Sequence, residues 1–527
     1  LGWERPLVEL CSDVLMEYRT GRNLDLEDTI VLVPTAQSGR LLRETLVRRL
    51  GEEGGSLLSA RFFLPSHLFR PKGVVAATSI QTLGAWLAVL QSREAGSLSS
   101  LFPAGVGWQD NPAGLLGLAR RLMEVADQLG ENGHSMNSVA QEKTEEPERW
   151  KDLARLESAV WELLGSKGLT ERNRAQTMAA CQACLPQSIK KVFVFGVPDP
   201  APLATQALAG LADSVDIVIH VHAPEELRPY FDEFGRPGDY FADMKNPIEF
   251  GPRVLKSSEP GAQAASLVDY LLKNGVRTEP DRFALCLPNP TSARLVAREL
   301  NENKIDNYDP AGLPVGKHPV GRVIFMLLEL VSSRSFVALS QLLRHPAFGL
   351  WLSGGEVIDG LLARFTKLQN DRLLESLEDL DYFSRNGSEL RPQVERILGL
   401  VEQLDADFQG GILAWLDELT LVLENRDGML EAVAEQLMTI FDRLSDPAYL
   451  ELVPEAQFRT QIFKKELATL VYYPSSQGIE LSGWLETHWS RADHLLILDM
   501  NAGIVPKLTK SDPFLPDSLR RQLGLAS

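Results

Sequence analysis

The sequence lacks the features that mark secreted and membrane proteins. Its four cysteines in 527 residues are too few and too scattered for a disulfide framework. No apolar run reaches the roughly 18 residues that a membrane-spanning helix needs, and the first residues do not resemble a signal peptide. These absences exclude a disulfide-stapled secreted domain and an integral membrane protein, so we expect a soluble protein of the reducing cytoplasm.

Positive charge is scarce as well. The chain carries 53 Lys and Arg residues against 71 Asp and Glu residues, which gives a net charge of −18. Because nonspecific affinity for DNA depends mainly on neutralising phosphates, this balance excludes a protein that coats polyanions with its whole surface. Any contact with nucleic acid must therefore be a local groove.

The remaining composition is that of an ordinary globular protein, with 44% hydrophobic and 24% charged residues. A chain of this length exceeds one hydrophobic core and predicts about three or four domains. The chain opens at Leu1 rather than at a methionine, and its last residues follow a strongly patterned segment. We therefore expect it to be a portion of a longer protein.

Short apolar runs predict the strands of parallel sheets, because strands buried on both faces are apolar throughout rather than alternating. Helical patterns follow several of them, at 40–50 and 292–300 for example. This alternation predicts a doubly wound α/β fold. The predicted strands are Ile30–Val33, Val192–Phe195, Ile217–Val221, Phe283–Leu287 and Leu495–Leu498.

Two long helical stretches interrupt the predicted sheets. Apolar residues at helical spacing predict helices at 115–129 and 150–163, and a second stretch covers roughly 336–465 before strand character returns at 471–473. The order of sheet, helices and sheet therefore occurs twice. It resembles the two RecA-like (P-loop NTPase-like) lobes of superfamily 1 helicases, each with a helical insertion. The predicted boundaries are 1–100 and 189–250 for the first lobe, 101–188 for its insertion, 251–335 and 469–527 for the second lobe, and 336–468 for its insertion.

The segment after the last predicted strand is polar and punctuated by Gly and Pro, and open α/β sheets place ligands at such strand ends. It resembles a motif of the AddB family, the B subunits of bacterial AddAB-type helicase-nucleases, where Met-Asn-Glu-Gly-x-x-Pro precedes an Asp-Pro-Phe-Leu element. Ala502 stands where the family has an acidic residue. Weaker similarities to the family occur earlier in the chain, in the same order as in the family, at Val31–Thr35, Arg149–Trp150 and Leu342–Pro346. The matching terminal residues are Met500, Asn501, Gly503, Pro506, Asp512, Pro513, Phe514 and Leu515.

The chemistry of an active helicase is missing from this chain. A phosphate-binding loop needs the spacing G-x-x-x-x-G-K-[ST], and the nearest stretch, Ala311–His318, has Ala for the first Gly and His for the hydroxyl. The acidic pair expected after Val192–Phe195 is reduced to Asp199, and residues 488–491 replace the Lys-Gly-Leu-Glu turn of active helicases. We therefore predict no ATP hydrolysis and no bound cofactor.

No nuclease or metal site is predicted either. The resemblance implies a PD-(D/E)xK nuclease domain in the full-length family, and Asp281 with Glu302 and Lys304 fits that pattern by letter alone. The surrounding runs predict a strand followed by a helix, whereas the motif needs both acids on adjoining strands. If this protein has such a domain, with the family's flanking iron–sulfur cysteines, it lies beyond residue 527. Cys181 and Cys184 lack a second pair to complete a tetrahedral metal site.

The loops at the carboxyl ends of the strands are the candidates for nucleic-acid binding. Pro34–Arg40 resembles the helicase motif that grips a single-stranded backbone with hydroxyls, N–H groups and an Arg. A helix start capped by Ser38 or Thr35 explains the same residues equally well. Ser79–Thr82 and the tryptophans at 484 and 489 are weaker candidates. The predicted DNA-binding residues are Thr35, Gln37, Ser38, Arg40, Gln81, Thr82 and Asn501.

Three hypotheses about function remain open. The first is a degenerate helicase-like subunit that binds single-stranded DNA and docks on an AddA-type motor subunit in double-strand break repair, as the resemblance implies. The second is the N-terminal portion of an ATP-dependent exonuclease subunit whose nuclease domain lies beyond residue 527. The third is a lobed protein that makes only protein contacts, which the acidic balance and Ala502 favour.

Overall fold

The computed structural model describes residues 1–92, 98–102, 111–142, 144–242, 254–355, 360–385, 388–423, 429–473, 477–505 and 512–525. The chain forms two compact units. We call Leu1–Pro310 with Ser476–Ser527 the sheet unit, and Ala311–Ser475 the helical unit. The class is α/β with parallel sheets, as the sequence predicts.

The sheet unit contains a first four-stranded parallel sheet, in the order β4-β2-β5-β6. Its two central strands are buried almost throughout, whereas the edge strand β6 is half-buried. The three apolar runs predicted in this region are confirmed to within one residue. The strands are β2 (Thr29–Leu32), β4 (Arg61–Phe63), β5 (Lys191–Phe195) and β6 (Asp216–His220).

Helices cover both faces of this sheet. Alternate side chains of each strand point to opposite faces, so each strand packs against helices on both sides. Val31 and Phe193 pack with α1 (Leu7–Met16) and α2 (Ala36–Glu52) on one face. Side chains of the opposite parity pack with α8 on the other face. The other helices of this part of the sheet unit are η1 (Pro65–Phe69), α3 (Ser79–Gln91), α4 (Pro112–Glu131), α5 (Met136–Val139), α6 (Pro147–Ser166), α7 (Arg172–Cys181), α8 (Pro202–Leu211), η4 (Glu225–Tyr230) and η5 (Asp239–Ala242).

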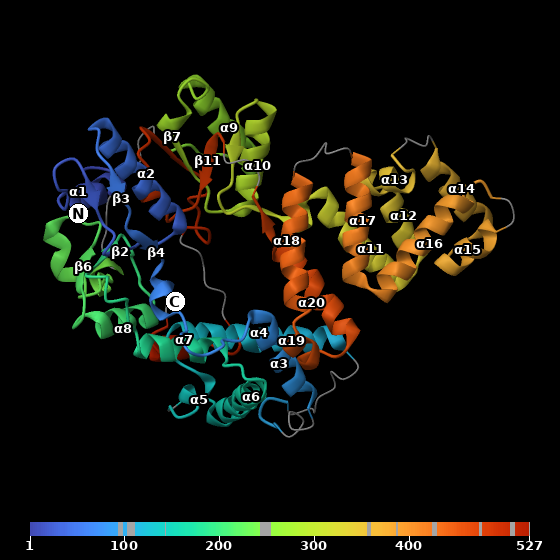
Figure 1. Ribbon diagram of the computed structural model, residues 1–527, viewed down its shortest axis with the longest axis horizontal. Helices are drawn as coiled ribbons and strands as arrows, with labels where there is room; N and C mark the ends of the chain where they lie inside the picture. The colour runs from blue at the N-terminus through green and yellow to red at the C-terminus, as the bar shows by residue number, and fades with distance from the viewer. Residues whose placement is uncertain are drawn as a thin grey trace. The chain divides into compact units, whose positions relative to one another are not determined.

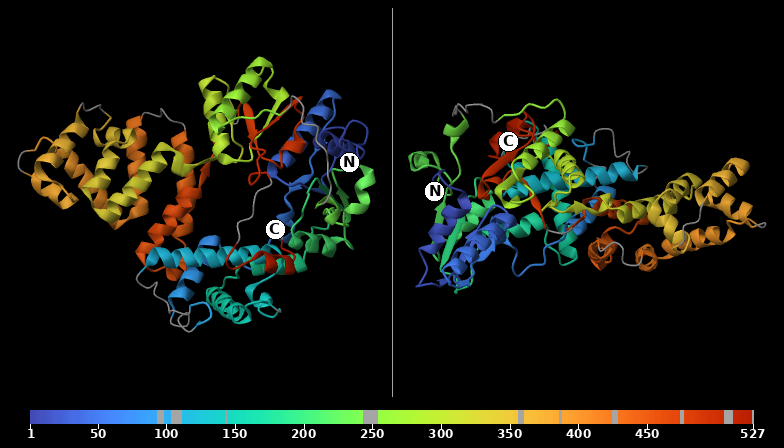
Figure 2. Two further views of the ribbon diagram at one scale, coloured as in Figure 1. Left: turned by 180° about the vertical axis from the view of Figure 1, so that it is seen from behind. Right: turned by 90° about the horizontal axis from the view of Figure 1, so that it is seen from above.

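A second four-stranded parallel sheet lies in the same unit, in the order β12-β7-β11-β8. It brings together residues from distant parts of the chain, and Figures 1 and 2 show β11, near the end of the chain, beside β7. Helices α9 and α10 pack together against it. The elements are α9 (Pro260–Lys273), η6 (Pro280–Arg282), β7 (Phe283–Cys286), α10 (Pro290–Glu302), β8 (Asn307–Tyr308), β11 (Ile479–Ser482), η8 (Thr487–Trp489), β12 (His494–Ile497) and α21 (Asp517–Gln522).

Two expectations about strands need correction. The last strand, β12, is not buried throughout, since it lies at the sheet edge with Leu495 47% and Ile497 38% exposed. Strand character at 471–473 is confirmed at β10 (Val471–Tyr472), but this strand pairs antiparallel with β9 (Leu313–Pro314) rather than with a parallel sheet. An apolar run therefore identified a strand without fixing its place in a sheet.

The helical unit is built from successive helices around α11, which packs against α12, α13, α16, α18 and α20. Leu330 and Leu339 are fully buried in it, and α16 and α17 pack side by side (Figure 1). The elements are β9 (Leu313–Pro314), η7 (Val315–Lys317), α11 (Pro319–Ser333), α12 (Phe336–Leu343), α13 (Pro346–Leu352), α14 (Leu361–Arg372), α15 (Leu377–Ser384), α16 (Arg391–Ala406), α17 (Phe408–Leu423), α18 (Met429–Leu444), α19 (Pro447–Leu452), α20 (Ala456–Thr469) and β10 (Val471–Tyr472).

One residue from the second sheet's strand connections completes the core of the first. Trp489, at the end of η8, is 1% exposed and packs with Leu7, Val8 and Phe195. The connection between β11 and β12 therefore contributes a side chain to the core of the first sheet. A small parallel pair, β1 (Leu24–Asp25) and β3 (Leu57–Leu58), lies beside the first sheet.

Candidate functional site

The loop after β2 begins helix α2 with a capped turn. Thr35 is the N-cap, and its Oγ1 accepts a hydrogen bond from the Ser38 N–H at 3.2 Å. The two hydroxyls lie 2.9 Å apart, and Ser38 is fully buried. The hydroxyl of Ser38 therefore serves the helix start and does not face solvent.

Gln37 and Arg40 extend from the same turn toward the second sheet. Gln37 Nε2 donates to Ser482 Oγ at 3.4 Å, and Arg40 Nη2 donates to Glu480 Oε2 at 2.6 Å. Glu480 Oε2 also accepts the hydroxyl of Tyr308. These contacts place the predicted loop at the junction of the two sheets, where β11 and β8 supply its partners.

The ionisable side chains Tyr308 and Arg40 are partly buried at this junction. Burial, and then the hydrogen bond to Glu480, raise the pKa of Tyr308 to about 12, so its hydroxyl stays protonated and donates. Partial burial opposes ionisation of Arg40, but Glu480 outweighs it and raises the Arg40 pKa. Arg40 remains 44% exposed, so the ion pair contributes at most about 1 kcal/mol and leaves the guanidinium accessible to an anion.

Gln81 and Thr82 lie in a different environment. Gln81 closes a capping box at the start of α3, since its Oε1 accepts from the Thr78 N–H at 2.8 Å. Both residues are buried, Gln81 at 7% and Thr82 at 4% exposure, and α3 packs against α4 and α6. The structure therefore places them in a helical layer rather than beside the loop after β2.

Asn501 follows the edge strand β12 and is exposed. Asp499 precedes it in the left-handed backbone region, with φ of 56°, and is 4% exposed. A non-glycine residue in this conformation is uncommon and marks a sharply turned strand end. Gly503 is also left-handed, whereas Pro506 lies outside the described residues.

The Asp-Pro-Phe-Leu element contacts the first helical stretch. Arg121 Nη2 pairs with Asp512 Oδ2 at 2.7 Å, and Asp512 is 5% exposed. The Arg149 guanidinium lies 4.8 Å from the centre of the Phe514 ring and donates to the carbonyl of Pro513 at 3.0 Å. Two segments singled out separately in the sequence therefore touch each other.

Further contacts continue along this segment. Arg520 Nη1 donates to Gln128 Oε1 at 2.9 Å, and a ring nitrogen of His134 lies 3.1 Å from the carbonyl of Leu523. Residues 512–525, which we call the terminal clasp, thus bind α4 and the start of α5 and α6.

Breaking the clasp should cost stability. Arg121→Ala leaves the buried Asp512 carboxylate with the Phe514 N–H, 2.8 Å away, as its remaining described partner. We expect a loss of about 2 kcal/mol in the free energy of unfolding, less than for a fully buried pair because Arg121 is partly exposed. Urea denaturation measures this loss, and limited proteolysis should cut the clasp faster. Lys151→Ala, which removes an exposed pair with Glu148, is the control and should change little.

A cavity of about 640 Å³ opens at the carboxyl ends of β2, β5 and β6. Gly196, with φ of 55°, lets the chain turn there, and an added Cβ would lie 3.4 Å from the Trp489 ring. Trp484 is 39% exposed at this cavity, whereas Trp489 is buried, so the two tryptophans lie in different environments. The lining residues are Trp3, Leu7, Pro34, Gly196, Val197, Pro198, Val221, His222, Phe231, Gly235, Pro237, Trp484, Leu485, His488 and Trp489.

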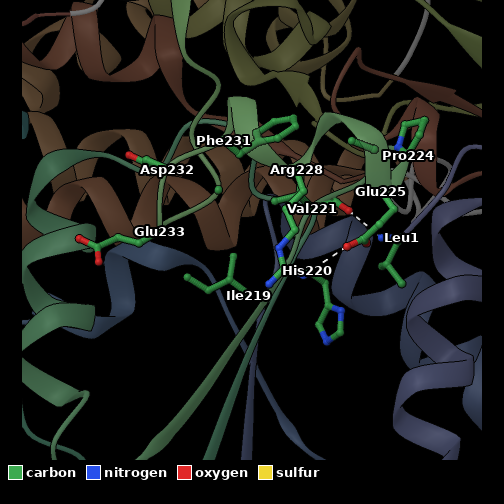
Figure 3. Close-up of a pocket in the computed structure, with 12 residues that line it drawn as sticks. Leu1, Ile219, His220, Val221, Pro224, Glu225, Arg228, Phe231, Asp232 and Glu233 are labelled. Carbon is green, nitrogen blue, oxygen red and sulfur yellow. Dashed lines mark hydrogen bonds and ion pairs between the residues drawn. The ribbon is translucent and has the colours of Figure 1, made fainter.

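A second cavity of about 500 Å³ lies beside the end of β6, as Figure 3 shows. Arg228 pairs there with Glu225 at 3.2 Å, and both side chains are more than 80% exposed. Asp232 and Glu233 also line it. Three acidic side chains thus outnumber Arg228 and the amino group of Leu1 among the described lining residues, which does not suit a phosphate.

The other segments with a possible chemical role have structural explanations. Cys181 ends α7 and Cys184 follows it, both exposed, and no group of three potential metal ligands occurs in the described part of the chain. The phosphate-loop-like stretch 311–318 contains β9 and a short 3₁₀ turn rather than a strand-to-helix loop. Asp281 and Glu302 lie on η6 and at the end of α10, so the predicted strand-then-helix order is confirmed.

No protein-family model and no curated protein matches this sequence. None of the helices in the described ranges combines the length and apolarity that a bilayer crossing requires. The functional assignment therefore depends on the site itself. The sequence did not identify Glu480, Tyr308 and Arg121 as site residues. Each of them contacts a partner that is more than 170 residues away in the chain.

Proposed function

We propose that this chain is a degenerate, AddB-type helicase-like subunit that binds single-stranded DNA and docks on an active motor subunit without hydrolysing ATP itself. It would act in the repair of DNA double-strand breaks in the cytoplasm. In this proposal the two parallel sheets are RecA-like lobes of superfamily 1 helicase architecture, and the two helical stretches are their insertions.

One observation carries the proposal. Two parallel four-stranded sheets share one compact unit, and the loop after β2 of the first sheet is hydrogen-bonded to the end of β11 in the second. Open α/β sheets bind ligands at the carboxyl ends of their strands. The exposed guanidinium of Arg40 at this junction suits a phosphate of a single strand.

The contact between Arg149 and Phe514 adds support. Arg149–Trp150 and the Asp-Pro-Phe-Leu element both contribute to the resemblance, and a functional relationship predicts that such segments meet in the fold.

The cavity near Gly196 also presents no cation among its described lining residues. This favours strand binding over nucleotide hydrolysis at the carboxyl edge.

Substitutions that remove the charge of Arg40 or of Glu480 test the proposed site. Arg40→Ala should weaken binding of a single-stranded oligonucleotide about tenfold by removing a charge-assisted hydrogen bond, and should lower the salt dependence of log K by about one unit. Glu480→Gln should strengthen binding, because it removes the carboxylate that competes for Arg40. Fluorescence anisotropy at two salt concentrations measures both effects.

Arg48→Ala is the matched control. Arg48 lies on the same helix, is 46% exposed, and pairs with Glu52 as Arg40 pairs with Glu44. It removes the same charge at a distance from the junction. Equal weakening by Arg40→Ala and Arg48→Ala would mean that the helix attracts DNA only diffusely, and the proposed site would be wrong.

A further inference from the structure

The cavity at the carboxyl ends of β2, β5 and β6 is lined by aromatic rings. Trp484 and His488 meet edge to face with ring centres 6.3 Å apart, and His488 meets His222 in the same way at 6.0 Å. Trp3 and Phe231 contribute two more rings. Aromatic faces of this kind favour flat unsaturated ligands, which stack on them with offset or edge contacts.

Charge is absent from the described residues that line this cavity. Burial lowers the pKa of His488, and burial followed by the neighbouring His488 lowers the pKa of His222. Both imidazoles are therefore neutral at pH 7. A phosphate or carboxylate would lose its hydration here without a compensating cation, whereas a neutral ring would not.

We propose that this cavity binds an uncharged planar heterocycle of the nucleobase type, stacked on Trp484. The cavity volume of about 640 Å³ falls within the range of small-molecule sites. The ligand is either a free base or nucleoside, or an unpaired base of a strand, since Pro34 of the wall directly precedes Thr35. The inference goes beyond the proposed function, because a free nucleoside satisfies it without any DNA.

Titration of the full chain with adenosine, AMP and ATP, followed by tryptophan fluorescence and isothermal calorimetry, tests this site. We expect saturable binding of adenosine, and AMP and ATP should bind no more tightly. Trp484→Ala should weaken adenosine binding at least about tenfold by removing the stacking face.

Two further arms complete the test. A single-stranded oligonucleotide that competes with adenosine identifies the ligand as a strand base, and one that does not identifies a free nucleoside; either result supports the site. Tyr382→Ala, an exposed aromatic residue of the helical unit, should leave adenosine binding unchanged. No saturable binding of adenosine, guanosine, cytidine or thymidine at millimolar concentration, or tighter binding of ATP than of adenosine, would overturn the inference.

Discussion

Trp489→Ala should lower the free energy of unfolding of the sheet unit by about 3 to 5 kcal/mol. Trp489 is 1% exposed and packs with Leu7 and Phe195 in the core of the first sheet, although it follows a strand of the second. Removing the indole leaves a cavity that the surrounding helix and strands cannot fill without moving. Urea denaturation followed by circular dichroism measures the loss.

Trp484→Ala is the control for that change. It removes the same side chain from the same connection, but Trp484 is 39% exposed, so a loss of no more than about 1 kcal/mol is expected. Trp489→Phe should fall between the two, because it restores part of the volume. Equal effects of Trp489→Ala and Trp484→Ala would contradict the packing of Trp489 in the core of the first sheet.

Gly478→Ala should cost about 3 to 4 kcal/mol. Gly478 has φ of 96°, and an added Cβ would overlap the backbone carbonyl of Asp306. That carbonyl cannot move freely, since it accepts the Ile479 N–H at 2.8 Å where β11 begins to pair with β8. Thermal and urea denaturation should show the loss, and the Arg40–Glu480 contact should be disturbed with it.

Gly168→Ala separates backbone strain from overlap. Gly168 has φ of 72°, and none of the described atoms would lie within 4 Å of its Cβ. We expect it to cost about 1 kcal/mol from the left-handed conformation alone. If Gly478→Ala cost no more than Gly168→Ala, the close approach of β11 to Asp306 would not exist in solution.

The central strands were the most predictable part of the fold. The runs at 30–33, 192–195 and 283–287 are apolar because β2, β5 and β7 are enclosed on both sides. The strands β4 and β8 were missed, since two or three residues carry too little pattern, and β11 was missed because it alternates buried and half-buried residues. Sheet order was not predictable either, since pairing partners such as β7 and β11 are far apart in the chain.

The candidate site was predictable only one residue at a time. The sequence identified Gln37 and Arg40, but not Ser482, Glu480 or Tyr308, which reach them through the fold. Local hydrogen bonds explain Thr35 and Gln81, because capping depends on neighbours three residues away. Side chains with local partners can thus be interpreted from sequence, whereas a site assembled from two sheets needs the structure.

Binding of labelled single-stranded and duplex oligonucleotides at two salt concentrations, with and without ATP and magnesium, tests the central claim most directly. The proposed function predicts salt-sensitive binding that prefers the single strand, does not depend on ATP, and weakens in Arg40→Ala but not in Arg48→Ala. Absence of binding by the folded chain at low salt, or ATP turnover by it, would contradict the account.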